Sequence, residues 1–200
     1  IRKGTLDRTP LAGLPAMRTS RTTGMLDMAL HPKFAENRLI YFTYHKPLEG
    51  EAYTLALGRG KYDGGAGLTE VRELYAGNAV RTGGSRLVFG KDGLIYITVG
   101  GAARTPEAQA TNSIAGKVLR LKDDGSVPAD NPFVGKAGAR PEIFTVGHRD
   151  HHGLAVHPVS GQIFHGELGP IGGDKINILK AGGNYGWPNV GYGRDNDGSP

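Results

Sequence analysis

The sequence predicts an all-β protein, and three observations support this fold class. The 200 residues include 33 glycines and 12 prolines, which separate short apolar stretches and follow no collagen-like period. No window shows a sustained helical periodicity of apolar residues. Three segments share one layout, an apolar strand, a tight turn and a second strand centred on Ile-Tyr or Ile-Phe, namely 28–44, 86–99 and 153–165. Each of the three is predicted to form a β-hairpin.

The turns of these hairpins and the strands between them indicate a repeated four-stranded unit. In the middle hairpin, Lys91-Asp92-Gly93 supplies the turn, because Asp and Gly tolerate the backbone conformation that a tight hairpin needs. Further strands are predicted at 55–62, 116–121, 142–146 and 175–179. At roughly 50 residues per four-stranded propeller blade, the chain supplies about three to four blades. We therefore expect residues 1–200 to form a single, partial β-propeller domain.

Composition excludes several classes of function. The net charge is +5, but Lys and Arg are scattered singly and form no stripe of the kind that nucleic-acid binders show. No segment approaches the roughly 20 apolar residues that a membrane-spanning helix needs. The absence of cysteine excludes disulfides, Cys-ligated zinc and thiol catalysis. The chain begins at Ile1 with no basic and apolar leader, so we expect any targeting signal to have been removed or to lie outside this sequence.

The densest polar cluster is the run from His148 to His152, directly after a predicted strand. Such a run could bind a transition metal through its imidazoles, or it could be a solvated loop. Adjacent residues on a strand point to opposite faces, which weakens a metal site built from His151 and His152 together. We favour the solvated loop, because no ligand spacing supports a metal site.

Two Gly-rich turns carry acidic residues. The segment from Glu167 to Asp174 is either a plain turn in which Asp174 binds its own backbone, or a hard-cation site made of backbone carbonyls. Composition favours the plain turn. The segment from Arg194 to Gly198 resembles part of a calcium loop but lacks the closing Glu, so a simple Asp-Gly turn is expected there too.

A collinear series of strings resembles the glucose/sorbosone dehydrogenase family, the quinoprotein sugar dehydrogenases. The likeness covers almost all of the chain, from about residue 24 to residue 188. The strings are GMLDMALHP (24–32), GGSRLVFGKDG (83–93), GKVLRLKDDGSVPADNPF (116–133), EIFTVGHRD (142–150), GLAVHP (153–158), GPIGGDKINIL (169–179) and GGNYGWP (182–188).

The resemblance implies a six-bladed β-propeller that binds pyrroloquinoline quinone and Ca²⁺ over its central channel. It implies oxidation of an aldose sugar to its lactone, an external electron acceptor and a periplasmic or secreted location. By motif match, Arg149 is expected to stabilise the charge that develops on the quinone oxygen, and Asp174 to orient Arg149. Gly169 and Pro170 match the backbone carbonyls that bind the cofactor's calcium.

Four departures from the family pattern affect the predicted site. Thr82 stands where the catalytic His is expected, and its hydroxyl cannot act as a base near neutral pH. Thr22 replaces a Gln, and Leu168 replaces a His before the Gly-Pro bend. Asp150 replaces the Asn that follows the Arg, which puts a carboxylate close to an anionic cofactor.

The missing base leaves several functions open. His148 or His151 could supply the base, in which case the protein remains a quinone- and calcium-dependent sugar dehydrogenase. Arg149, Asp150, Gly169, Pro170 and Thr82 are then the predicted cofactor contacts. The alternatives are a calcium-dependent lactonase and a non-catalytic propeller that binds a carbohydrate or a protein, because propellers host unrelated functions.

Overall fold

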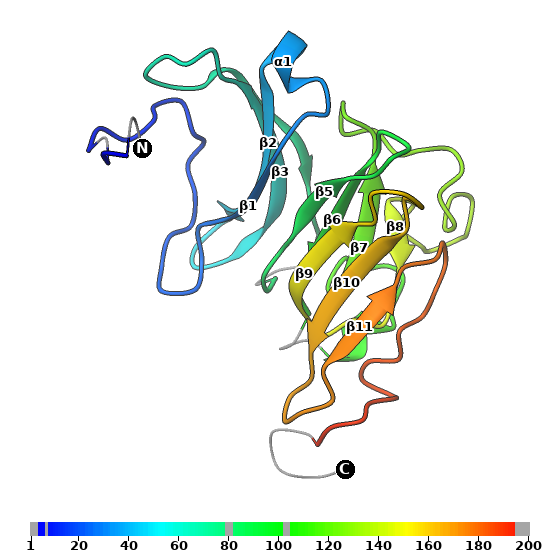
Figure 1. Cartoon of the computed structure of the whole chain (residues 1–200). Coiled ribbons are helices and arrows are strands. Elements are labelled where there is room, and N and C mark those ends of the chain that lie inside the picture. The colour runs from blue at the N-terminus through cyan, green and yellow to red at the C-terminus, as the bar shows by residue number, and fades with distance from the viewer. Residues whose placement is uncertain (1–3, 7, 79–81, 102–104, 195–200) are drawn as a thin grey trace.

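The computed structural model describes residues 4–6, 8–78, 82–101 and 105–194, and these residues form three antiparallel sheets (Figure 1). Helix is confined to two short pieces in this part of the chain, α1 (Phe34–Asn37) and the 3₁₀ turn η1 (Thr105–Ala108). The predicted all-β class is confirmed. No described helix is long and apolar enough to span a membrane.

The first sheet has four strands in the order β1-β2-β3-β4. Their bounds are β1 (Met25–Leu30), β2 (Leu39–Pro47), β3 (Tyr53–Lys61) and β4 (Thr69–Ala76). The first predicted hairpin is confirmed, since Met28 pairs with Phe42. Its turn holds α1, which ends at Arg38 in the left-handed region (φ 59°). The sequence did not predict β4, whose strand TEVRELYA carries three charged residues.

The second sheet also has four strands, in the order β5-β6-β7-β8. Their bounds are β5 (Leu87–Phe89), β6 (Ile95–Val99), β7 (Lys117–Leu121) and β8 (Ile143–Thr145). All five residues of β6 are buried, as expected for a central strand rich in β-branched residues. The predicted turn chemistry is confirmed: Asp92 Oδ1 accepts the Leu94 N–H at 3.1 Å, and Gly93 has φ 76°.

The third sheet has three strands in the order β11-β10-β9. Their bounds are β9 (Asp150–Val156), β10 (Ile163–Leu168) and β11 (Lys175–Ile178). The third predicted hairpin is confirmed by the pairing of β9 with β10, which carries a register shift between Gly166 and Glu167. This irregularity lies at the end of β10 where the candidate site begins.

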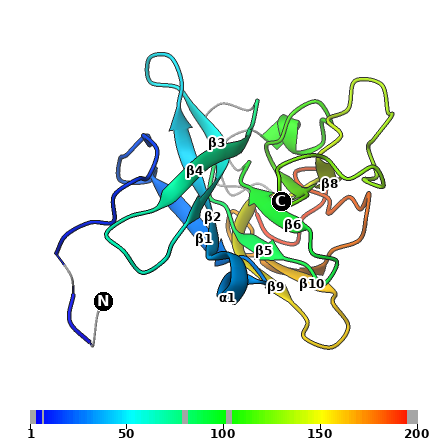
Figure 2. The ribbon, with the colours of Figure 1, turned by 90° about the horizontal axis from the view of Figure 1, so that it is seen from above.

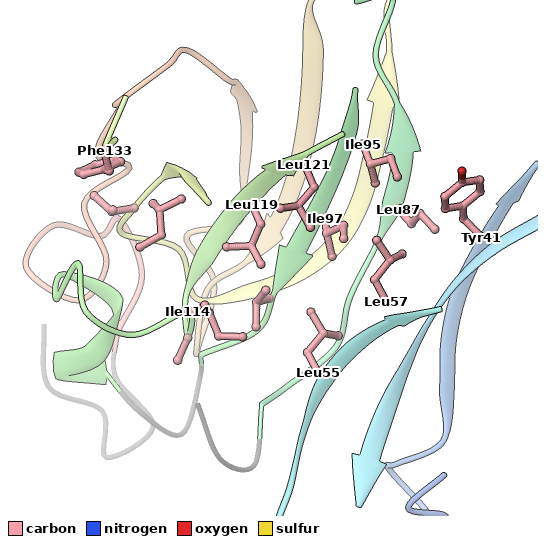
Figure 3. Close-up of a cluster of buried hydrophobic side chains, with 14 residues drawn as sticks. Tyr41, Leu55, Leu57, Leu87, Ile95, Ile97, Ile114, Leu119, Leu121 and Phe133 are labelled. Atoms are coloured by element: carbon pink, nitrogen blue, oxygen red, sulfur yellow. The ribbon is translucent and has the colours of Figure 1, made fainter. Parts of the chain in front are cut away.

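The sheets pack on one another as propeller blades do (Figure 2). The first strands β1, β5 and β9 contact one another in sequence, which places them on the inner side of the array. Between the first two sheets, Leu55 and Leu57 face Leu87 and Ile97 in one buried cluster (Figure 3). A second buried cluster joins the second and third sheets through Val118, Phe144, Ile163 and others. Blade-to-blade stacking therefore buries the apolar faces.

Exposed apolar side chains lie on the two outermost sheet faces, although Phe42, Tyr44 and Ala56 of the first sheet are buried against Met17, Leu68 and Val71. On β1, Met25, Met28 and Leu30 are exposed, while Leu26 and Ala29 pack toward the second sheet. On β11, Ile176 is 81% exposed and Ile178 is also exposed. The 200 residues thus end at a partly uncovered blade on each side.

Candidate functional site

A basic pocket of about 300 Å³ lies at the end of the third sheet where β10 stops. Its walls are Arg149 just before β9, the segment 167–170 at the end of β10, Lys175 on β11, and the segment 187–194. Three cations, Arg149, Lys175 and Arg194, line it against one acid, Glu167. This balance favours an anionic ligand.

Arg149 is held in place from several sides. Its guanidinium Nη1 donates to the Leu168 carbonyl at 3.3 Å and to the Gly169 carbonyl at 3.0 Å. The same group lies over the Trp187 ring, 5.5 Å from the centroid. Its backbone N–H donates to Glu167 Oε1 at 2.9 Å, and its carbonyl accepts from the Gly101 N–H. The guanidinium is therefore oriented toward the pocket before any ligand binds.

The Gly169-Pro170 bend is closed by Asp174, as the plain-turn interpretation predicted. Asp174 Oδ1 accepts the Gly169 N–H at 3.1 Å. A Cβ on Gly169 would collide with the Gly172 carbonyl oxygen, and Gly172 and Gly173 both have positive φ, 70° and 73°. The bend needs these glycines. Asp174 thus fixes the loop that carries the Gly169 carbonyl. Any effect of Asp174 on the orientation of Arg149 passes through that carbonyl, which accepts from Arg149 Nη1.

The run from His148 to His152 is not a solvated loop, so that interpretation is wrong. Asp150, His151 and His152 belong to β9, and the alternation of a strand places them on opposite faces. His148 and His151 are buried, whereas the His152 side chain is 53% exposed. The inward histidines meet β10, which contributes further buried polar groups.

The buried groups form one network behind the pocket. His148 Nδ1 lies 3.1 Å from Glu167 Oε2, and His148 Nε2 lies 2.8 Å from Thr145 Oγ1. His151 Nδ1 lies 2.6 Å from His165 Nε2, and His151 Nε2 donates to the Val99 carbonyl at 2.9 Å. Burial lowers the pKa of His148 and of His165 to about 3 and that of His151 well below its usual value. All three imidazoles are neutral near pH 7.

The predicted site residues separate into two groups. Arg149, Gly169 and Pro170 lie together in the pocket. His151, Asp150, Asp174 and Thr82 lie outside its wall. Asp150 Oδ2 instead lies 3.6 Å from the exposed His152 Nε2, so the expected extra carboxylate points to a histidine.

Thr82 is buried beside the first sheet. Its carbonyl accepts from His45 Nε2 at 3.2 Å, and its hydroxyl has no hydrogen-bond partner among the described residues. The neighbouring segments 79–81 and 102–104 lie outside the described residues, as do 195–198 of the expected Asp-Gly turn. Thr22, which replaces the Gln of the family pattern, is exposed.

The structure adds residues that the sequence did not single out. Trp187 and Lys175 line the pocket, and His165 joins the buried network. The sequence held one signal for His165: it lies two residues from Ile163 and two from Glu167, and residues at this spacing on a strand share one face. The structure shows that this face is buried.

Three sheets stacked face to face, with a basic pocket at one end of the third, are the architecture of part of a β-propeller. The family model described as Glucose / Sorbosone dehydrogenase matches residues 1–200, and the chain belongs to this family. The chain spans half the length or less of the curated relatives cited below.

Two of the curated relatives are named as sugar dehydrogenases. The chain is 38% identical to aldose sugar dehydrogenase YliI of Escherichia coli over 184 residues, which is 90% of this chain and 50% of the relative. It is 36% identical to quinoprotein glucose dehydrogenase B of Acinetobacter calcoaceticus over 202 residues, 88% of this chain and 42% of the relative. The family is therefore one of oxidoreductases.

One relative has been solved with pyrroloquinoline quinone (PQQ) bound. The PQQ-bound form of aldose sugar dehydrogenase from Streptomyces coelicolor superposes with a TM-score of 0.79 at 29% identity. The superposition covers 94% of this chain and 55% of that one. The fold of the relative thus extends over almost all of the chain.

Proposed function

We propose that the whole protein oxidises an aldose sugar to its lactone with pyrroloquinoline quinone and Ca²⁺, and passes the electrons to an external acceptor. The observation that carries the proposal is the basic pocket in which Arg149 lies over Trp187 and against the Gly169 carbonyl. The quinoprotein and PQQ-bound relatives support it. Arg149, Lys175 and Trp187 would hold the quinone, which would supply the hydride acceptor for the sugar's anomeric carbon.

The pocket residues fit an anionic quinone that carries three carboxylates. Arg149, Lys175 and Arg194 supply positive charge, and Lys175 Nζ donates to the Tyr185 carbonyl at 2.9 Å and lies 3.4 Å from Glu167 Oε1. Two buried donors of the pocket wall, Arg149 Nε and Trp187 Nε1, have no partner among the described residues. Buried donors without acceptors are costly, so acceptors on a ligand would stabilise them.

Calcium would need the Gly169 carbonyl, which now accepts from Arg149 Nη1. A cation at this oxygen repels the guanidinium, so calcium binding requires Arg149 to turn toward the anionic quinone. Pro170, the second expected carbonyl, stands next in the same bend. We infer that quinone and calcium bind with positive cooperativity, since the carboxylates of the quinone attract both the calcium ion and the guanidinium that the ion displaces from the Gly169 carbonyl.

The base that takes the sugar's hydroxyl proton is part of this proposal. His151 can act as this base only if its ring moves away from the Val99 carbonyl and from His165, because both of its ring nitrogens are hydrogen-bonded to these groups. His148 is engaged in the same way by Thr145 and Glu167. Thr82 supplies no base. A residue outside the described part of the chain is the other source.

The test is a calorimetric and absorbance titration of the full-length protein with the quinone, with and without Ca²⁺, followed by dye reduction with a panel of aldoses. Calcium-dependent binding with dye reduction supports the proposal, and Arg149→Gln should abolish both. The matched control is Arg86→Gln, an arginine whose Nε donates to the His152 carbonyl outside the pocket. Absence of quinone binding to the wild type would refute the proposal.

The Thr82 substitution favours the alternatives, a lactonase or a sugar- or protein-binding propeller. A calcium-dependent lactonase would hydrolyse lactones with calcium alone and reduce no dye. A binding module would take up a ligand saturably without turnover. The periplasmic or secreted location remains a prediction from the family resemblance, and further blades, up to the six of a closed ring, are proposed to cover the exposed faces of β1 and β11.

A further inference from the structure

Three metal-ligating side chains converge behind the pocket, inside the third sheet. One ligand atom from each of His148, His165 and Glu167 lies within 4.8 Å of the others. Glu167 Oε2 is 3.1 Å from His148 Nδ1 and 3.8 Å from His165 Nδ1. Two ligands of a tetrahedral zinc ion, each about 2.0–2.2 Å from the metal, are about 3.4 Å apart. The observed spacing therefore suits one shared ion.

The hydrogen bonds fix which nitrogen of His165 is free. The Val99 carbonyl can only accept, so His151 Nε2 carries the proton of that neutral ring. His151 Nδ1 is then an acceptor, and the 2.6 Å contact requires His165 Nε2 to donate. His165 Nδ1 is left with a lone pair that faces the Glu167 carboxylate, and the described donor near both atoms is Asn177 Nδ2, at 3.4 Å and 3.1 Å. Two electron-rich atoms that face each other in a buried site favour a cation between them.

We propose that His148, His165 and Glu167 bind a divalent transition-metal ion, with Zn²⁺ as the first candidate. Two imidazole nitrogens and one carboxylate suit zinc and related ions, whereas Ca²⁺ takes oxygen ligands. This site is separate from the calcium expected at Gly169 and does not depend on the quinone. The ligand side chains of both histidines are fully buried, so the ion is structural.

The surrounding groups form the outer shell that such a site needs. His165 Nε2 donates to His151, whose Nε2 donates to the Val99 carbonyl, and the Thr145 hydroxyl oxygen can accept a hydrogen bond from the His148 Nε2–H when Nδ1 binds the metal. The second carboxylate oxygen of Glu167 accepts from the Arg149 N–H and faces Lys175, away from the three ligand atoms.

Asn177 completes the site on the open side. Its Nδ2 lies 3.1 Å from Glu167 Oε2 and 3.4 Å from His165 Nδ1. A half-turn of the amide would present Oδ1 as a fourth ligand. Because Glu167 also accepts the Arg149 N–H, the ion would fix the backbone of the pocket's main cation.

The experiment uses the full-length protein, unfolded with a chelator and refolded without metal. It is titrated with Zn²⁺ by calorimetry and with Co²⁺ by visible absorbance, in excess Ca²⁺ and without quinone. One tight site, with Co²⁺ bands typical of four-coordinate nitrogen and oxygen ligation and insensitivity to Ca²⁺, is the expected result. Wild-type protein that binds neither ion overturns the proposal.

Variants locate the ion. His165→Gln and Glu167→Gln should lose the Co²⁺ bands, while His152→Gln, an exposed histidine on the same strand, keeps them. If a ligand variant does not fold, Thr145→Val replaces it, because loss of an outer-shell partner weakens metal affinity by about 10–100-fold. Equal affinity in the wild type, His165→Gln and Thr145→Val would also overturn the proposal.

Discussion

The second and third sheets pack against each other but fill their interiors with opposite chemistry. The central strand β6 of the second sheet is buried and almost wholly apolar along its length. The central strand β10 of the third sheet buries His165 and Glu167 beside Ile163. An apolar interior stabilises by burial alone, whereas the polar interior depends on every partner being present. The second sheet is therefore stabilised along β6 by apolar burial, whereas the third depends along β10 on paired polar groups.

The largest loss of stability is expected from a substitution in the apolar interior. Ile97→Ala removes a fully buried side chain of β6 and should lower the free energy of unfolding by about 2–5 kcal/mol, measured by denaturant titration. The control is Val159→Ala in the turn between β9 and β10, where the side chain is 82% exposed and about 0.5 kcal/mol or less is expected. Equal losses of stability in Ile97→Ala and Val159→Ala would contradict the conclusion that burial of β6 stabilises the second sheet.

The next largest loss of stability is expected where a buried polar group loses its hydrogen-bond partner. Thr145→Val removes the hydroxyl 2.8 Å from His148 Nε2 and should cost about 1–3 kcal/mol, because a buried nitrogen loses its partner. Thr43→Val is the matched control, since its buried hydroxyl has no partner among the described residues. The control should be neutral or stabilising in the same denaturant titration, and a larger loss for Thr43→Val would contradict this account.

A buried lysine gives the second sheet a pH dependence. Lys117 Nζ donates to the Glu107, Ala108 and Ala115 carbonyls, and burial lowers its pKa to about 7. Between pH 7 and its unfolded pKa near 10.4, the unfolded state binds more protons, so its contribution to stability rises with pH by up to about 1.4 kcal/mol per unit. The stability difference between wild type and Lys117→Met, measured from pH 7 to 10, should therefore shift in favour of the wild type. A constant difference would show that Lys117 titrates normally.

The smallest effect concerns the pocket wall. Trp187→Phe keeps an aromatic face below Arg149 but removes the indole N–H, and it should weaken quinone binding by about 0.5–2 kcal/mol. Because Trp187 is buried and the phenylalanine ring is smaller than the indole, a loss of stability is expected as well, and denaturant titration measures it separately. Calorimetric titration of the wild type and of Trp187→Phe with the quinone measures the difference in affinity. An unchanged affinity would place the quinone away from Trp187.

Much of the fold was predictable from local sequence, because turns and alternation act over a few residues. The hairpin closed by Asp92 and Gly93 is an example. Strand β4 escaped prediction because it lies at a sheet edge, where exposed charged residues such as Glu70 and Arg72 hide the alternation. Edge strands are held by pairing with a partner strand more than by their own pattern.

The candidate site was predictable only in part. Arg149 and the Gly169-Pro170 bend come together as the family strings imply. The burial of His148 and His151 was not predicted, because it depends on the pairing of β9 with β10, in which Glu167 lies opposite His151. Sequence adjacency made His151 and His152 look like one solvated group, while the strand separates them into opposite faces.

The uncovered blade faces have a consequence for how the 200-residue chain behaves on its own. The face of β1 with Met28 and the face of β11 with Ile176 are different surfaces at opposite ends of the stack. Contact between them joins one copy's last blade to the next copy's first, which is a heterologous contact. Such contacts add copies in one direction, so the isolated chain should form either closed rings or open filaments as its concentration rises.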